Sequence, residues 1–352
     1  MKIFFRSDAS VHIGSGHVMR CLVLAKILRD KGHDVAFATR PQEGDFVDYI
    51  KQQNIPVIEL QRSNNIIPPK ADNDYSAWLQ LPWLDDASDF ITKTEEADLV
   101  IVDHYGINKD WEKYVSEMLN CKMFIIDDLV REHYAHLILD QTFGREQQEY
   151  ISKVNGAKML VGSYYSLLAP RYGELRKLAE EKNLLIQDHK VLVTMGAIDN
   201  PNVTLKVLKA LLSIENISVT VLLSPKAPHY ESVSLFCRNC AWITHIDFSD
   251  DVATLMLEHN IAIGAPGSTT WERACLGLPS IIIPIADNQK DIAENIANTG
   301  AAIKLNIADI ESGFKNAYKL LTDNWLEYRL ANFKITDGLG AFRVVKHVES
   351  LN

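Results

Sequence analysis

The sequence of 352 residues lacks the features of secreted, membrane-spanning and nucleic-acid-binding proteins. Only 5 residues are cysteines, an odd number that does not suit a disulfide framework. No apolar run approaches the roughly 20 residues that a membrane span needs. Lys and Arg number 36 against 46 Asp and Glu, a net charge of −10, whereas a phosphate backbone is bound by a basic surface. We therefore expect no nucleic-acid partner and no membrane partner.

Signals for secretion and for metal binding are also missing. The first residues, MKIFF, lead directly into polar Arg6, Ser7 and Asp8, so no signal peptide is predicted and the expected location is the cytoplasm. Cys237 and Cys240 have CxxC spacing, but no second ligand pair follows, and we interpret them as reduced thiols. No DxD-like segment stands where a sugar-nucleotide enzyme binds its metal. We predict no metal and no other cofactor.

What the sequence does contain is the alternation of an α/β protein. Hydrophobic residues make up 47% and charged residues 23%, the ordinary range of globular proteins, and the length allows two domains. The first predicted elements are strand Ile3–Phe5, a helix after Gly16, strand Val35–Ala38, helix Phe46–Gln53 and strand Val57–Leu60. Strands alternating with helices predict a parallel sheet.

The predicted domain boundaries follow this alternation. They are an N-terminal Rossmann-like domain at 1–166, an interdomain connection at 167–187, a C-terminal Rossmann-like domain at 188–330 and a C-terminal helical segment at 331–352 that packs back on the first domain. Residues 61–96 interrupt the first alternation with a loop and a helix predicted over Tyr75–Thr92. The expected fold class is α/β, with two Rossmann-like domains whose parallel sheets face a central cleft.

The first motif with chemical meaning is GSGHVMR, residues 14–20, between the first strand and the first helix. Gly14 and Gly16 let the backbone approach a ligand, and the N–H groups that open a helix attract anions. Met19 replaces the third glycine of GxGxxG, which argues against a dinucleotide site. His17 lies in the first helical turn, where the helix dipole disfavours imidazolium, so it is a candidate general base. The alternative is that His17 only caps or packs the helix.

The second motif, GAPGSTTWE at residues 264–272, again joins a strand end to a helix start. The hydroxyls of Ser268 and Thr269, together with backbone amides, suit a diphosphate. Glu272 has the position of an acidic residue that binds ribose hydroxyls in nucleotide folds. The alternative is a capping box, with Ser268 or Thr269 as cap and Glu272 as its partner.

Smaller polar clusters stand at the predicted carboxyl ends of strands, where parallel sheets bind ligands. These clusters are Arg6-Ser7-Asp8, Asp103-His104-Tyr105, Met195-Gly196-Ala197 and Asp287-Asn288-Gln289. Each alone is typical of a loop. Together they predict polar groups along one edge of both sheets.

These blocks resemble a known family. FRSDAS, IGSGHVMRCLVLA, IVDHYG, MGAIDN, GSTTWERACLGLP and DNQ are similar to the UDP-sugar hydrolases of the pseudaminic acid pathway, which remove UDP from UDP-2,4-diacetamido-2,4,6-trideoxy-β-L-altropyranose. The resemblance runs through most of the chain, and its C-terminal block is shared with GT-B glycosyltransferases of the MurG type. It implies a GT-B fold, no metal, and attack by water at the anomeric carbon with inversion.

The resemblance also implies roles for single residues. It makes His17 the catalytic base, places Tyr105 beside the sugar, and puts Ser268, Glu272 and Asn288 at the nucleotide. Two departures are Gly196-Ala197 in place of a glycine pair and a longer stretch at residues 64–90. The predicted substrate-binding set is Arg6, Asp8, Gly14, Gly16, Tyr105, Gly196, Ser268, Thr269, Glu272 and Asn288.

The predicted function is metal-independent hydrolysis of a UDP-linked diacetamido-trideoxy hexose to the free sugar and UDP. A phosphate group has a second pKa of about 6, so UDP leaves with little acid help. The protein then has to activate water and hold the charge of the diphosphate. One alternative is a GT-B glycosyltransferase, with an acceptor hydroxyl in place of water. Another is a non-catalytic sugar-nucleotide-binding protein, which would not require a histidine at the helix start.

Overall fold

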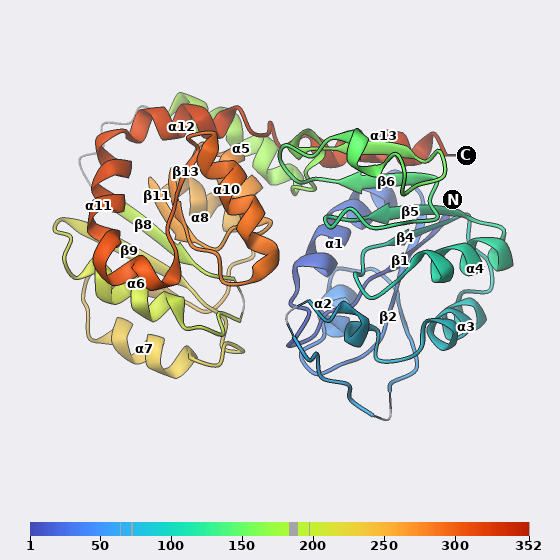
Figure 1. Cartoon of the computed structure of the whole chain (residues 1–352). Coiled ribbons are helices and arrows are strands. Elements are labelled where there is room, and N and C mark those ends of the chain that lie inside the picture. Colours follow the sequence, from blue (N-terminus) through green and yellow to red (C-terminus); the bar gives the residue numbers. More distant parts are fainter. Residues whose placement is uncertain (64, 72, 183–188, 197, 352) are drawn as a thin grey trace. The chain divides into compact units, whose positions relative to one another are not determined.

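The computed structural model describes residues 1–63, 65–71, 73–182, 189–196 and 198–351. The chain folds into two compact units, one made of Met1–Leu167 with Leu339–Asn352 and the other of Leu168–Gly338. Each unit has a sheet covered by helices, as Figure 1 shows. Both sheets are wholly parallel in their described pairings, as the alternation of strands and helices predicts.

The N-terminal unit has a seven-stranded sheet in the order β3-β2-β1-β4-β5-β6-β7. Its strands are β1 Lys2–Arg6, β2 Asp34–Thr39, β3 Val57–Glu59, β4 Leu99–Val102, β5 Lys122–Ile126, β6 Leu137–Asp140 and β7 Lys158–Val161. The central strands are almost entirely apolar because helices bury both faces of the sheet. Strands β6 and β7 were not among the predicted elements.

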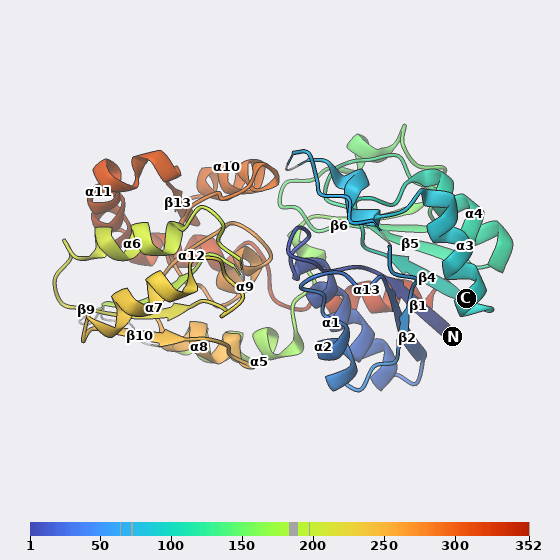
Figure 2. The ribbon, with the colours of Figure 1, turned by 90° about the horizontal axis from the view of Figure 1, so that it is seen from below.

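The helices of this unit divide between the two faces of the sheet. They are α1 Gly16–Asp30, α2 Val47–Gln52, α3 Trp83–Thr94, α4 Lys109–Leu119 and α13 Gly340–Glu349, with short 3-10 helices at η1 Tyr75–Leu79, η2 Gln147–Tyr150 and η3 Ser163–Tyr165. Helices α3 and α4 lie side by side in Figures 1 and 2. The last helix, α13, packs beside α1, and its Val344, Val345 and Val348 share one apolar core with Val18 and Leu24.

The helix predicted over Tyr75–Thr92 is in fact two elements. The 3-10 helix η1 ends at Leu79 and is followed by Gln80, which has a left-handed φ of 62°, and α3 starts after Pro82. Proline lacks an N–H and clashes within a helix, so it is tolerated before the first turn and not in the middle. This break directs the η1 side chains toward the carboxyl edge of the sheet.

The second unit has a six-stranded sheet in the order β10-β9-β8-β11-β12-β13. Its strands are β8 His189–Thr194, β9 Ile217–Leu222, β10 Ile243–Ile246, β11 Ile261–Gly264, β12 Ser280–Ile282 and β13 Ala302–Lys304. Its helices are α5 Pro170–Glu181, α6 Val203–Leu211, α7 Tyr230–Arg238, α8 Val252–Glu258, α9 Thr269–Cys275, α10 Lys290–Asn298, α11 Ile310–Asp323 and α12 Trp325–Phe333, with 3-10 turns η4 Asp287–Gln289 and η5 Ile307–Asp309. The segment expected as a connection contains α5, which packs against α8 and α9 within this unit.

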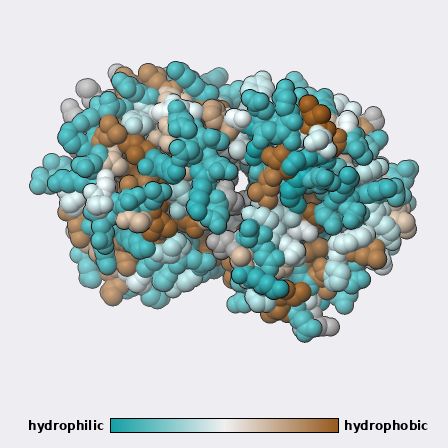
Figure 3. Space-filling view, in the orientation of Figure 1, coloured by the Kyte–Doolittle hydropathy of each residue, from teal (hydrophilic) through white to brown (hydrophobic). Residues whose placement is uncertain are grey.

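The surface of each unit is mostly hydrophilic on the face shown in Figure 3, with hydrophobic groups in small separate patches. Within the described parts of the chain, no helix combines the length and apolar character needed to cross a membrane.

Candidate active site

The first turn of α1 brings His17 to the carboxyl edge of the N-terminal sheet. Strands β1 and β4 are neighbours, with Arg6 opposite Val102, so Asp103 directly follows a strand beside the start of α1. The Nδ1 atom of His17 lies 2.6 Å from a carboxylate oxygen of Asp103. Because an ionised carboxylate only accepts hydrogen bonds, Nδ1 carries the proton and Nε2 carries the lone pair. His17 is therefore held in the tautomer that a general base requires.

Arg20 fixes Asp103 from the next turn of the same helix. Its Nε and Nη2 atoms donate to the two carboxylate oxygens at 2.6 and 2.8 Å. Asp103 is fully buried, which opposes ionisation, but the charge of Arg20 and the hydrogen bonds from Arg20 and His17 hold its pKa well below the usual range. The carboxylate stays ionised at neutral pH and stabilises the imidazolium that forms when His17 takes a proton.

A second carboxylate ties Tyr105 to this group. Asp128 accepts hydrogen bonds from Arg20 Nη1 and from the Tyr105 hydroxyl, both at 2.6 Å. Burial and the nearby Asp128 charge raise the pKa of Tyr105 well above its usual value, so the phenol stays protonated. The Tyr105 ring stands edge-on to His17 with centroids 4.6 Å apart. Tyr105 thus fixes the plane of the His17 imidazole.

Aromatic side chains from η1 form a wall beside His17. The Trp78 ring lies 5.7 Å from the His17 ring and stacks on Tyr105 at 5.4 Å. Tyr75 contacts both Trp78 and Tyr105, with centroids 4.9 and 5.1 Å apart. The His17 side chain keeps 11% of its surface exposed, so the wall leaves the imidazole open to a small reactant. The interruption at residues 61–96 therefore contributes part of the candidate site.

Arg6 and Asp8 lie beneath the edge of the sheet. Both side chains are fully buried, and Arg6 Nη1 donates to Asp8 at 2.5 Å. Arg6 also pairs with Asp86 at 2.8 Å, and His104 Nε2 lies 3.1 Å from Asp8. Side chains without exposed surface cannot contact a ligand directly. The predicted substrate contacts of Arg6 and Asp8 are therefore corrected to a structural role, which is to hold the ends of β1 and β4 together.

Gly14 and Gly16 shape the turn before α1. Gly14 has a φ of +76°, which favours glycine, and its N–H donates to the Ser10 carbonyl at 2.8 Å. A Cβ at either glycine would meet no described atom within 4 Å, so the space above the turn is open. Ser15 at the helix start makes no side-chain cap. The first N–H groups of α1 are thus oriented as they are in anion-binding helices.

The second motif lies in the C-terminal unit, between β11 and α9. Ser268 is exposed and makes no side-chain cap, so it does not form the capping box that was the alternative for Glu272. Burial raises the pKa of the half-buried Glu272, and a hydrogen bond from Tyr172 opposes this shift. The buried Arg273 donates to Thr269 Oγ1 at 3.2 Å. Burial lowers the pKa of Arg273 to about 10, which leaves it charged at neutral pH.

The other predicted residues of this unit are placed only in part. Gly196 follows β8 with a φ of +89°, a conformation suited to glycine, whereas Ala197 is outside the described residues. The backbone of Asn288 belongs to η4, and its side chain is also outside the described part. Asp199, in the same MGAIDN block, caps α6 by accepting from the Val203 N–H at 2.9 Å.

Metal ligands do not converge in the parts of the chain that the structure describes, where no group of three His, Cys, Asp or Glu side chains is arranged to hold an ion. Asp86 and Asp127, which belong to two of the Asp-Asp pairs in the sequence, form salt bridges. Asp86 pairs with Arg6 and Arg40, and Asp127 pairs with Arg131 and His133.

Four residues of the site were given no role of their own in the sequence analysis: Arg20, Trp78, Asp128 and Asp103, the last of which belongs to one of the polar clusters at strand ends. The sequence carries a signal for three of them. Arg20 is three residues after His17 and so shares its helix face. Asp103 and Asp128 follow buried strands at the edge where ligands bind. Trp78 has no such signal, because η1 is irregular.

Comparison with known proteins places this geometry in context. Residues 190–330 match the Glycosyltransferase family 28 C-terminal domain. The chain is 27% identical over 310 residues to the UDP-2,4-diacetamido-2,4,6-trideoxy-beta-L-altropyranose hydrolase of Campylobacter jejuni, which covers 86% of this chain and 99% of that protein. It is also 27% identical over 295 residues to an uncharacterized protein of Methanocaldococcus jannaschii. This match covers 80% of this chain and 55% of that protein, so the chain spans about half of the relative's length.

Solved structures show the same fold. MurG of Acinetobacter baumannii aligns over 99% of both chains with a TM-score of 0.66 at 17% identity. The predicted GT-B fold with two parallel-sheet α/β domains is confirmed, and so is the resemblance that the sequence blocks indicate. The chain therefore has the GT-B fold, matches the Glycosyltransferase family 28 C-terminal domain over residues 190–330, and is similar over most of its length to the Campylobacter jejuni hydrolase.

Proposed function

We propose that this chain hydrolyses a UDP-linked diacetamido-trideoxy hexose, UDP-2,4-diacetamido-2,4,6-trideoxy-β-L-altropyranose, to the free sugar and UDP, in the cytoplasm and without a metal ion. The observation that carries the proposal is the pair formed by His17 and the buried Asp103, 2.6 Å apart, at an open glycine turn. The similarity to the Campylobacter jejuni hydrolase supports the choice of sugar.

In this mechanism His17 is the general base. Its Nε2 takes a proton from water while the water oxygen attacks the anomeric carbon from the face opposite UDP. The bond between the anomeric carbon and the diphosphate oxygen breaks, and its electron pair leaves with UDP, so the configuration inverts. Asp103 stabilises the imidazolium, and Arg20 keeps Asp103 in place. A positioned general base contributes about 10²–10⁴-fold to the rate.

The C-terminal unit is proposed to hold the nucleotide. The hydroxyls of Ser268 and Thr269 and the backbone around them would bind the diphosphate, with Arg273 as a nearby cation. Glu272 would accept hydrogen bonds from the ribose hydroxyls. This role is supported by the absence of a side-chain cap from Ser268, which leaves Glu272 without its capping-box partner.

A second candidate function is transfer of the sugar to an acceptor hydroxyl. It is favoured by the family 28 domain of the C-terminal unit. The same His17 would deprotonate that hydroxyl, so the site residues do not separate the two reactions. The two reactions are distinguished in the assay, by whether UDP release requires an added acceptor.

The test is to incubate the chain with several UDP-sugars, without acceptor, and to measure UDP release with and without EDTA. We expect release from the diacetamido-trideoxy sugar, unchanged by EDTA. In H₂¹⁸O the label should enter the sugar, because attack is at carbon. Label in UDP would exclude attack at the anomeric carbon. Loss of activity in EDTA with recovery in Mg²⁺ or Mn²⁺ would exclude a metal-independent reaction. Release that requires an added acceptor would favour the transferase.

A further inference from the structure

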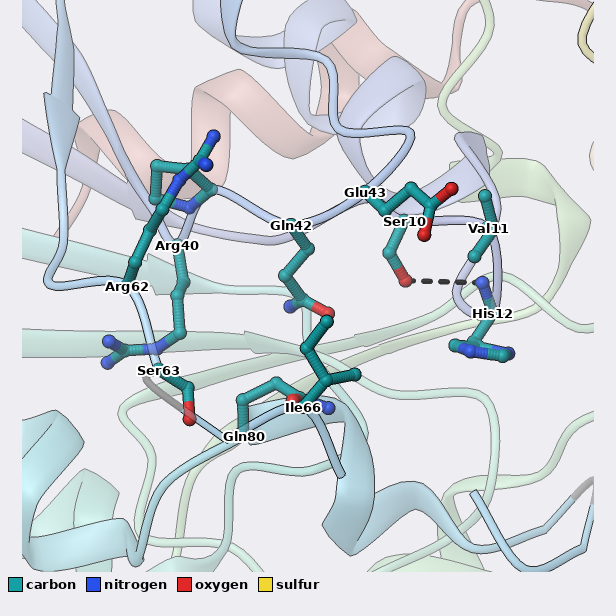
Figure 4. Close-up of a pocket in the computed structure, with 11 residues that line it drawn as sticks. Ser10, Val11, His12, Arg40, Gln42, Glu43, Arg62, Ser63, Ile66 and Gln80 are labelled. Atoms are coloured by element: carbon teal, nitrogen blue, oxygen red, sulfur yellow. Dashed lines mark hydrogen bonds between the residues drawn. The ribbon is translucent and has the colours of Figure 1, made fainter. Parts of the chain in front are cut away.

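Arg273 differs from the other deeply buried arginines of the described structure. Arg6, Arg40 and Arg273 all have almost no exposed surface. Arg6 pairs with Asp86 at 2.8 Å, and Arg40, beside the cavity shown in Figure 4, pairs with the same carboxylate at 2.5 Å. The hydrogen bonds that Arg273 donates within the described parts of the chain instead go to neutral oxygens. Its charge is therefore buried without a salt bridge to match it.

The neutral oxygens that bind Arg273 all belong to the turn between β11 and α9. Nη1 donates to the Thr269 hydroxyl at 3.2 Å, and Nη2 donates to the Ala265 carbonyl at 3.1 Å and to the Thr270 hydroxyl at 3.4 Å. The buried Nε has no hydrogen-bond partner among the described residues. The guanidinium thus holds the first turn of α9 to the segment that follows β11.

A buried charge without a partner is unfavourable, so the presence of Arg273 needs a reason. Burial lowers its pKa to about 10, and the nearby charge of Glu272 opposes this shift only in part. Arg273 nevertheless stays protonated at neutral pH. An apolar side chain of similar size in place of a buried ionic group is often neutral or stabilising, so packing alone does not require an arginine here. An anion bound close to the turn would supply the missing countercharge.

The position of Arg273 in the sheet agrees with such an anion. A Cβ at Gly264, the last residue of β11, would come within 2.8 Å of Arg273 Nη1 and 2.5 Å of the Thr194 carbonyl oxygen, at the end of β8. Strand β8 has β9 on one side and β11 on the other, so the strand order reverses between β8 and β11. Parallel sheets bind ligands outside the carboxyl ends of their strands at such a point. The unmatched charge therefore lies beneath the place expected for a ligand.

The Thr269 hydroxyl provides the path from Arg273 to a ligand. Arg273 is too deeply buried to contact a ligand itself, whereas Thr269 is half-buried. Because Thr269 Oγ1 accepts from Arg273, its own hydrogen must point elsewhere. Its acceptor in the structure is the Ala265 carbonyl, at a long 3.4 Å, and that carbonyl already accepts from Arg273. The hydrogen is thus available to a phosphate oxygen, and a donor that polarises a hydroxyl strengthens the bond that the hydroxyl donates.

We infer that Arg273 is a positioning residue for the diphosphate of the nucleotide: it directs the Thr269 hydroxyl toward a phosphate oxygen and places a positive charge behind the turn. The inference rests on the proposed function for the nucleotide and deepens it, because Arg273 acts through Thr269 without touching the ligand. It follows that the affinity for the diphosphate depends on Arg273, while the affinity for the nucleoside does not.

The experiment is calorimetric titration of the full chain with UDP and with uridine, which lacks the diphosphate. Arg273→Met, of similar length but uncharged, should weaken UDP binding at least about tenfold, as expected for one lost charge-assisted hydrogen bond, and uridine binding less than about twofold. Arg273→Lys keeps the charge and should restore part of the preference for UDP. The matched control is Arg329→Met, which removes another buried arginine of this unit. Arg329 donates to the Gly277 and Ala179 carbonyls, away from the turn, so the preference should not change.

Thr269→Val tests the path by which Arg273 acts. It should lower the preference for UDP, Thr269→Ser should retain it, and Arg273→Met should add little to Thr269→Val in the double variant. Because Thr269 is only half-buried, this variant still decides the question if Arg273→Met does not fold.

Several results would overturn the inference. They are an equal loss of UDP and uridine affinity in Arg273→Met, no loss of either, an unchanged preference in Thr269→Val, and losses that add in the double variant. Wild type that does not prefer UDP to uridine would overturn it as well. The titrations involve no turnover. A chain that keeps the Arg273-dependent preference but releases no UDP from UDP-sugars would therefore refute only the proposed function.

Discussion

Replacing Asp103 by Asn tests the role of the buried carboxylate without changing its shape. In the native site both carboxylate oxygens accept hydrogen bonds, from His17 and from Arg20. Asn has a single oxygen, whereas Arg20 donates to both carboxylate oxygens, so in either orientation the NH₂ group of Asn faces an Arg20 donor. In either orientation Asn also carries no charge, so it cannot stabilise the imidazolium that forms when His17 takes a proton.

Asp103→Asn should therefore lose the whole general-base contribution, about 10²–10⁴-fold in kcat. At 1.36 kcal/mol per factor of ten, this is about 2.7–5.4 kcal/mol of transition-state stabilisation. KM should change little, because Asp103 is buried and does not reach the substrate. The assay is UDP release under saturating UDP-sugar, with thermal unfolding measured on the same preparation to show that the variant is folded.

The double variant Asp103→Asn with His17→Leu provides the sharper comparison. If the two residues act as one unit, the double variant is no slower than His17→Leu alone. Losses that add in the double variant would show that Asp103 acts independently of His17. A folded Asp103→Asn protein with nearly normal kcat would show that the Asp103 charge does not support His17 in the reaction.

Three other outcomes are expected. His17→Leu should lower kcat by about 10²-fold or more while the affinity for UDP, measured by product inhibition, stays the same; near-normal kcat would return His17 to a packing role. Glu272→Gln should raise KM far more than it lowers kcat in the same steady-state assay, and a collapse of kcat at constant KM would exclude the ribose role. The third concerns stability: hydrogen bonds to Asp127 and Glu112 outweigh burial and raise the pKa of His133 to about 9 in the folded protein. The raised pKa adds about 3 kcal/mol to the free energy of unfolding. This contribution is fully present below pH 6.5 and is lost as the pH rises to 9. Denaturant titrations of wild type should show that decline and His133→Gln should not, whereas parallel pH dependences of the two proteins would contradict the assignment.

The sequence was sufficient to predict the two parallel sheets and the first helix, because periodicity and glycine turns are local signals. The contact between His17 and Asp103 was not predictable in this way. The two residues are 86 positions apart and meet because β1 lies next to β4, and strand order is not encoded in local periodicity. The burial of Arg6 and Asp8 escaped prediction for a related reason. Their charges are tolerated inside the protein only because the fold brings oppositely charged partners to them.

Helix α13 has a consequence for the order in which the protein folds during synthesis. The second unit is one continuous stretch, so all of its core residues are available once Gly338 has left the ribosome. The core of the N-terminal unit instead includes Val344, Val345 and Val348, which follow the whole second unit along the chain. The unit that carries His17 is therefore begun before the second unit and completed after it, and the face of α1 that packs against α13 stays uncovered until the whole second unit has been made.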